Sequence, residues 1–169
     1  MRWSLSSIAR AAMLAFALSS MALRPACAGN VPHPFDSTSW QTLLSTHKGH
    51  PVIVHFWGFS CGNCMVELND WGRFAKTHPD AVIAFVNWDR RGADPARIES
   101  ALDKAGLGSV QSYVLGSGFE EKLRFAVDHD WMGELPYTRL IAGDGTATTF
   151  SGAADFTKLS QWLDGQGQR

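Results

Sequence analysis

Two cysteines separated by two residues give the strongest chemical signal in the sequence. They form the motif Cys61-Gly62-Asn63-Cys64, which closely follows a short apolar run. On the first turn of a helix, two cysteines at this spacing can form a disulfide, and unpaired backbone N–H groups stabilise the thiolate of the first. We therefore expect Cys61 to be the low-pKa nucleophile. Cys64 is expected to be the deeper thiol that attacks a mixed disulfide on Cys61.

Other uses of the pair are less favoured by the sequence. An inert structural disulfide would contribute little, because so short a loop removes little entropy from the unfolded chain. A structural zinc site needs about four ligands, and the sequence holds neither a second C-x-x-C nor an H-x-x-x-H. We expect redox chemistry with no metal ion and no separate cofactor. Binding of Cu(I) by the two thiolates, with Met65 as the adjacent sulfur, is the alternative.

The elements that must position the pair follow from the apolar pattern. Residues 52–57 form a continuous apolar run, which is typical of a central strand buried on both faces. From Cys61, apolar residues recur at helical spacing until His78-Pro79, so a helix begins at or just before the first cysteine. Residues 81–88 predict a second buried strand. The other expected elements are an extended arm over 29–36, helices over 37–47, 95–105, 118–128 and 154–163, a strand over 111–115, and a hairpin over 137–142 and 147–150.

This order of elements predicts an α/β fold with a central mixed β-sheet flanked by helices on both faces. No linker or change in composition divides residues 29–169, so we expect a single domain there. Ser37 or Ser39 is expected to cap the first helix. Residues 88–91 are expected to form a solvated turn, and residues 128–130 a polar loop.

The first 28 residues have the pattern of an export signal. Arg2 and Arg10 flank the start of the chain, an apolar stretch covers residues 11–23, and the small residues Ala26-Cys27-Ala28 follow. The apolar stretch of about 13 residues is shorter than the about 20 that span a bilayer as a helix, although an uncleaved anchor is the alternative. We expect cleavage after Ala28, which removes Cys27, and a location in the periplasm, where disulfides persist.

The charge balance argues against some classes of partner. The sequence has 15 Lys and Arg against 16 Asp and Glu and no basic run, so nucleic acid is not an expected partner. Loss of Arg2, Arg10 and Arg24 with the signal would leave 15 − 3 = 12 basic groups against the same 16 acidic groups. The exported domain is therefore expected to be mildly acidic, and we expect it to be a monomer.

Two segments of the sequence resemble a known family. Residues 54–68, from Val54 to Leu68 around the cysteine pair, resemble the active-site strand and helix of the thioredoxin superfamily. The closest likeness is to the exported thiol-disulfide oxidoreductases of the TlpA/ResA kind. Residues 133–141, followed by Asp144-Gly145, are similar to the second signature of that family. The likeness spans roughly residues 35–165 and implies a thioredoxin-like fold.

The resemblance also implies an activity and partners. It suggests a periplasmic enzyme that exchanges disulfides with client proteins through transient mixed disulfides. Because members of the family mostly reduce, we expect a reductase that receives electrons from a membrane donor. A disulfide oxidant or isomerase is an alternative within the same chemistry, and copper delivery or tolerance through Cu(I) binding is an alternative outside it. Asn63 replaces the proline common inside the pair, and Ser60 replaces the tryptophan often found before it.

The resemblance implies further site residues around Cys61 and Cys64. Pro136 matches the cis-proline that packs beside the pair in the family, whereas without the resemblance a trans proline would be expected. Glu67 lies where the family has a glutamate near the pair. Because one helical turn separates it from Cys64, we expect it to relay the proton of the resolving thiol, and a solvated helix residue is the alternative. His55 is a possible proton acceptor beside Glu67, or a core histidine satisfied by one hydrogen bond.

Three apolar residues are expected to form the surface that meets a partner. Trp57 and Phe59 follow the buried strand and precede the cysteine pair, and Leu135 precedes the proline of the second signature. For Trp57 and Phe59, a place in the core is an equally good interpretation.

Overall fold

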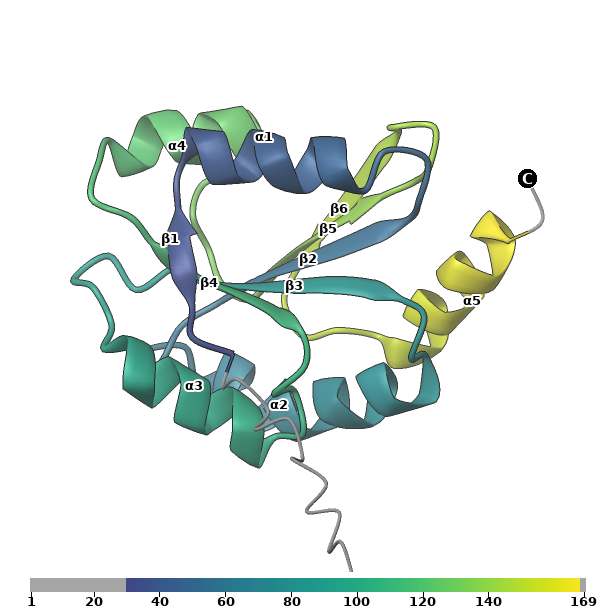
Figure 1. Cartoon of the computed structure of the whole chain (residues 1–169), viewed down its shortest axis with the longest axis horizontal. Helices are drawn as coiled ribbons and strands as arrows, with labels where there is room; N and C mark the ends of the chain where they lie inside the picture. The colour runs from purple at the N-terminus through teal and green to yellow at the C-terminus, as the bar shows by residue number, and fades with distance from the viewer. Residues whose placement is uncertain (1–29, 168–169) are drawn as a thin grey trace, which may run out of the picture.

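The strands form one twisted sheet that crosses the middle of the molecule (Figure 1). The computed structural model describes residues 30–167, so the expected signal peptide, with Cys27, lies outside the described residues. The sheet has the order β1-β4-β3-β2-β5-β6. The first four strands in this order run parallel, and β5 and β6 are antiparallel additions at one side. The strand bounds are β1 His33–Phe35, β2 Val52–Trp57, β3 Val82–Asn87, β4 Gln111–Leu115, β5 Tyr137–Ile141 and β6 Ala147–Ser151.

Helices cover both faces of this sheet, as the sequence predicts (Figure 1). On one face lie α1 (Ser37–Thr46) and α4 (Glu120–Val127), which pack on a core that includes Trp40 and Leu123. On the other face lie α2 (Gly62–Thr77), α3 (Pro95–Lys104) and α5 (Phe156–Gln166), which pack on a second core. The expected α/β fold with a mixed central sheet is therefore confirmed, and the strands and helices lie within a few residues of their predicted bounds.

The central strand β2 decides which side chains lie beneath the cysteine helix. All six of its residues are buried. Because successive side chains point to opposite faces of a strand, Val54 and Phe56 enter the core under α1 and α4, whereas Ile53 and Trp57 enter the core under α2. His55 has the same parity as Ile53 and Trp57, so its imidazole faces α2.

The start of the described chain differs from the sequence-based expectation in two details. The cap of α1 is Asp36, not Ser37 or Ser39: its carboxylate accepts hydrogen bonds from the backbone N–H groups of Thr38 at 2.9 Å and Ser39 at 2.8 Å. A carboxylate one position earlier reaches both N–H groups, and the Ser39 hydroxyl instead accepts from the N–H of Asp36 at 2.7 Å. The extended arm contains the short strand β1, which pairs with β4 because Phe35 is buried in the core.

No helix within residues 30–167 has the length and apolar character needed to cross a bilayer.

A close approach between α2 and the end of α3 depends on Gly72. A methyl group at this position would lie 1.7 Å from the carbonyl oxygen of Ala105, which is a backbone atom that cannot move alone. Gly165 in α5 is a matched comparison, since a methyl group there would have no atom within 4 Å. The contact of α2 with its neighbour therefore requires glycine at position 72.

We expect Gly72→Ala to lower the free energy of unfolding by about 1–3 kcal/mol, because the contact between the two backbone segments must open to admit the methyl group. Gly165→Ala should leave stability unchanged or raise it by up to about 1 kcal/mol, because alanine favours the helix. Denaturant unfolding followed by circular dichroism measures both. Equal stability of Gly72→Ala and the parent protein would contradict the close packing of α2 against residue 105.

Candidate functional site

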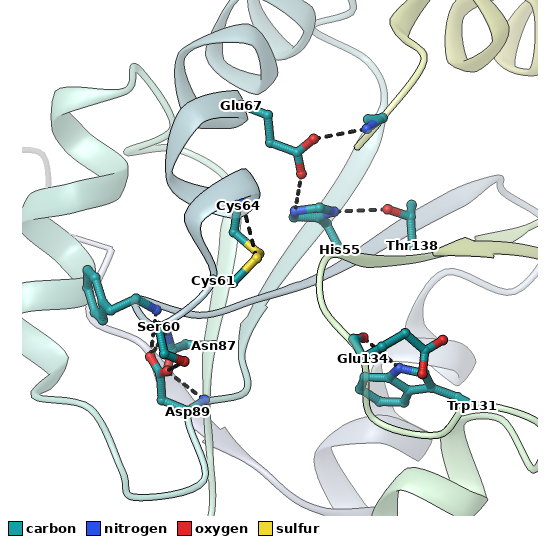
Figure 2. The surroundings of a disulfide bond; sticks show 12 residues. His55, Ser60, Cys61, Cys64, Glu67, Asn87, Asp89, Trp131, Glu134 and Thr138 are labelled. Atoms are coloured by element: carbon teal, nitrogen blue, oxygen red, sulfur yellow. Dashed lines mark hydrogen bonds and ion pairs between the residues drawn. A yellow bond between two sulfur atoms is a disulfide. The ribbon is translucent and has the colours of Figure 1, made fainter. Parts of the chain in front are cut away.

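The two cysteines form a disulfide at the beginning of α2 (Figure 2). Cys61 is the N-cap residue of the helix, and its sulfur accepts a hydrogen bond from the N–H of Cys64 at 3.1 Å. Cys64 lies on the first turn and is fully buried, whereas Cys61 is partly exposed. The outer sulfur is thus the one that another molecule can reach, and it lies at the positive end of the helix dipole, where a thiolate is stabilised.

The loop that delivers Cys61 is held by the carboxylate of Asp89. This carboxylate accepts hydrogen bonds from the N–H of Phe59 at 2.9 Å and the hydroxyl of Ser60 at 3.1 Å (Figure 2). Asn87, at the end of β3, donates its amide to the same carboxylate at 3.0 Å. Gly58 permits the approach, because a methyl group there would lie 2.8 Å from a carboxylate oxygen of Asp89. The turn between β2 and α2 is therefore fastened to the end of the neighbouring strand.

The sequence analysis missed the role of Asp89. The expected solvated turn is correct for Arg90 and Arg91, which are exposed, but wrong for Trp88, which is buried. It is also wrong for Asp89, which is half-buried and points at the loop before Cys61. The order of the strands could have indicated this role. Asp89 closely follows β3, and the carboxyl ends of the parallel strands β3 and β2 lie side by side, so Asp89 lies near the loop that follows β2.

Beneath the disulfide, His55 of β2 meets Glu67 of α2. The imidazole Nε2 lies 3.2 Å from a carboxylate oxygen of Glu67, and both residues are buried. The other imidazole nitrogen, Nδ1, lies 2.9 Å from the hydroxyl of Thr138 on β5. The second carboxylate oxygen of Glu67 accepts from the N–H of Ala154, just before α5, at 2.9 Å. Figure 2 shows this group of side chains on the Cys64 side of the disulfide.

The hydrogen bonds of this group define its protonation. Burial lowers the pKa of His55, and the nearby Glu67 carboxylate only partly offsets that effect. Burial alone would raise the pKa of Glu67, but hydrogen bonding and charge interaction with His55 and the Ala154 N–H leave it below its usual value. Near neutral pH, Glu67 is therefore ionised and His55 is neutral. An ionised carboxylate only accepts, so Nε2 carries the imidazole proton and Nδ1 accepts from the Thr138 hydroxyl.

The structure excludes the solvated interpretation of Glu67 and the single-hydrogen-bond interpretation of His55. Glu67 is not a solvated helix residue, because its side chain faces β2 and is 6% exposed. His55 makes two polar contacts, not the single hydrogen bond of a simple core histidine. Thr138 was not among the expected site residues. The pairing of β2 with β5 would have indicated this residue, because Thr138 lies directly opposite His55 in the antiparallel register of the two strands.

The second signature, the segment around Leu135 and Pro136, lies against the loop that precedes Cys61. The peptide bond between Leu135 and Pro136 is cis. Pro136 is buried, and its carbonyl accepts from the N–H of Gly152 at 2.8 Å. Leu135 is half-buried and so close to the loop before Cys61 that a methyl group on Gly58 would lie 3.2 Å from its side chain. The structure therefore places the residues of both signatures side by side.

The expected partner surface is wrong in one of its three residues. Trp57 is fully buried and packs edge-on against Phe59, so its ring belongs to the core. The reason is the parity of β2, which turns the last side chain of the strand into the core under α2. Phe59 and Leu135 are both partly exposed and remain available to a partner.

The polar loop at residues 128–130 has a structural explanation. One ligand atom from each of Asp128, His129 and Asp130 lies within 4.8 Å of the others. The carboxylate of Asp128, however, accepts hydrogen bonds from the hydroxyl of Tyr137 at 2.5 Å and the guanidinium of Arg139 at 2.7 Å. Burial and this hydrogen bond raise the pKa of Tyr137 to about 12. Asp128 thereby joins the loop after α4 to β5, and we assign no metal to it.

Comparison with solved structures places this arrangement among known folds. No protein-family model and no curated protein matches the sequence. A secreted Mycobacterium tuberculosis disulfide oxidoreductase, described as homologous to Escherichia coli DsbE, superposes with a TM-score of 0.57 and 19% identity over 72% of this chain and 85% of that one. An exposed lipoprotein thioredoxin from Streptococcus pneumoniae gives 0.54 and 21% over 72% and 89%. A putative thioredoxin from Neisseria meningitidis gives 0.54 and 22% over 74% and 79%.

These structures share the mixed sheet and the helices on both of its faces. The resemblance of the sequence to the thioredoxin superfamily is confirmed at the level of the fold. The chain has a thioredoxin-like fold and carries a bonded cysteine pair at the start of α2.

Proposed function

We propose that this protein is a periplasmic thiol-disulfide oxidoreductase of the TlpA/ResA kind that reduces disulfides in client proteins through Cys61 and Cys64. The observation that carries the proposal is the asymmetry of the pair: the outer sulfur is accessible at a helix N-terminus, and the inner sulfur is fully buried. Export is supported by the signal-like sequence of residues 1–28. The cysteines are the only redox group that this reaction requires.

The reaction proceeds in two exchanges. In the reduced protein, the Cys61 thiolate attacks one sulfur of a client disulfide, which forms a mixed disulfide and releases the other client sulfur as a thiolate. Cys64 then loses its proton and attacks the Cys61 sulfur, which forms the Cys61–Cys64 disulfide and releases the client. Two electrons pass from the pair to the client. A membrane dithiol donor would restore the reduced pair by the reverse exchange.

The proton of Cys64 needs an acceptor in the protein interior, because Cys64 has no exposed surface. The ionised Glu67 lies beneath the pair with His55 against it, and we assign the carboxylate of Glu67 this role. His55 holds that carboxylate in place through its Nε2, 3.2 Å away. Thr138 and the N–H of Ala154 are positioning groups, since they hold the imidazole and the carboxylate in one orientation. Phe59 and Leu135, which are partly exposed, form the surface next to the outer sulfur that meets the client, and the buried Pro136 supports it directly after Leu135.

We expect Cys64→Ser to accumulate covalent complexes with client proteins in the host, because the mixed disulfide on Cys61 can no longer be resolved. Non-reducing gels followed by mass spectrometry of the adducts measure this outcome. The matched variant Cys61→Ser should form few such complexes, since the remaining thiol is buried. Recovery of no adduct with Cys64→Ser under oxidising or reducing conditions would contradict the exchange function. A reduction potential near about −120 mV, typical of strong oxidants, would contradict the reducing direction.

We expect Glu67→Gln and His55→Ala to slow the attack of Cys64 at pH 7 by at least about tenfold, as loss of a general base does. In the parent protein the rate should be nearly level from pH 6.5 to 8, because the pKa values of His55 and Glu67 are lowered and the acceptor stays unprotonated there. In the variants the rate should rise roughly tenfold per pH unit, because only thiolate already formed reacts.

A symmetrical aromatic disulfide separates the two steps, since it releases one coloured thiol when Cys61 attacks and a second when Cys64 resolves the adduct. Glu121→Gln is the control, because it removes the same charge from an exposed position on α4. An unchanged pH profile in His55→Ala would remove His55 from the mechanism.

A further inference from the structure

A hollow of about 790 Å³ opens beside the outer cysteine. One wall is the loop before Cys61, with Phe59 and Ser60, and another is Leu135, the residue before the cis-proline. The remaining wall is formed by the segment between β3 and α3, which contributes Arg90 and Arg91, and by the first turn of α3, which contributes Arg97. The hollow is therefore built from the same two signatures that surround the redox pair, together with a basic segment.

Both carboxylates that line the hollow accept hydrogen bonds from other groups of the protein. Asp89 accepts three hydrogen bonds from the Cys61 loop and Asn87. Asp94 caps α3 by accepting from the N–H of Ala96 at 3.1 Å. Arg90, in turn, is paired with Glu120 at 2.9 Å. These groups serve the fold.

Two arginines of the hollow have no such partner. Among residues 30–167, Arg91 and Arg97 form no ion pair with a carboxylate, and both are exposed. The guanidinium of Arg97 lies 3.9 Å from the centre of the Phe59 ring. Stacking uses the flat face of a guanidinium and orders the side chain, but it leaves the N–H groups at the edge free to bind a carboxylate. Arg97 is thus held in place with its donors unused.

We infer that this hollow binds an acidic side chain of the client, next to the cysteine that reacts with Cys61. The inference rests on the proposed exchange function and names its substrate class. Phe59 is two residues from Cys61, a span of at most about 7 Å, so the acidic residue would lie within about three positions of the client cysteine. The exported chain is acidic overall, so an acidic client gains attraction only where the arginines are gathered.

The test uses the Cys64→Ser protein and peptides whose single cysteine is joined to pyridine-2-thiol. The Cys61 thiolate attacks the peptide sulfur, the peptide–pyridine S–S bond breaks, and pyridine-2-thione leaves with the electron pair and a proton. Three peptides differ only at the position two residues from cysteine, which is Glu, Gln or Lys. Absorbance of the released thione gives the second-order rate constant for each.

We expect the Glu peptide to react about three- to fivefold faster than the Gln peptide at low salt, as an exposed charge pair allows, and the Lys peptide to be slowest. Arg97→Gln should lower the Glu-to-Gln ratio, the double change with Arg91→Gln should bring it to about one, and Arg97→Lys should restore only part of it. Arg73→Gln is the matched control: this exposed arginine on α2 is paired with Asp70 and does not line the hollow, so the ratio should stay unchanged.

Equal rates for the three peptides would overturn the inference while leaving the exchange function intact. An equal loss of preference in Arg73→Gln and Arg97→Gln would also overturn it, since total charge and not the hollow would then set the preference. Failure of all three peptides to react would contradict the exchange function itself.

Discussion

The imidazole of His55 and the carboxylate of Glu67 meet 3.2 Å apart in the interior, and the inner half of the site depends on this contact. A buried carboxylate costs several kcal/mol unless donors satisfy it. Glu67 has a partner on each side: one carboxylate oxygen lies 3.2 Å from the imidazole Nε2 on β2, and the other accepts from the backbone N–H of Ala154 before α5. These contacts therefore join the cysteine helix to the central strand and to the segment before the closing helix, and they hold the carboxylate on the Cys64 side of the pair.

Asp89 plays the corresponding part on the outer side. Its carboxylate collects hydrogen bonds from the loop that precedes Cys61 and from Asn87, so the end of β3 holds the turn that presents the reactive sulfur. These donors orient the Asp89 carboxylate toward the loop. Among residues 30–167, Arg91 and Arg97 of the adjacent segment form no ion pair with a carboxylate, so their guanidinium groups line the hollow beside the pair.

Glu67 and Asp89 lie on opposite sides of the disulfide, Glu67 on the side of Cys64 and Asp89 at the loop before Cys61. On the inner face, burial and hydrogen bonding keep Glu67 ionised and His55 neutral, which suits removal of a proton from a thiol that water does not reach. On the outer face, the helix N-terminus stabilises a thiolate and an exposed surface admits a second protein. In the proposed reaction, the order of the two exchanges follows from this division, because the outer sulfur is partly exposed and the inner one is fully buried.

The sequence alone determined the elements and the identity of the reactive pair. Apolar periodicity located β2, α2 and the hairpin of β5 and β6, and the C-x-x-C spacing at a strand-to-helix junction indicated redox chemistry, because both signals depend on residues that are near one another in the chain. The contacts of Asp89 with the Cys61 loop, of Thr138 with His55, and of Ala154 with Glu67 join residues 29 or more positions apart. Only the tertiary structure decided these contacts and the burial of Trp57, because strand register and the packing of α2 on β2 determine which distant side chains meet.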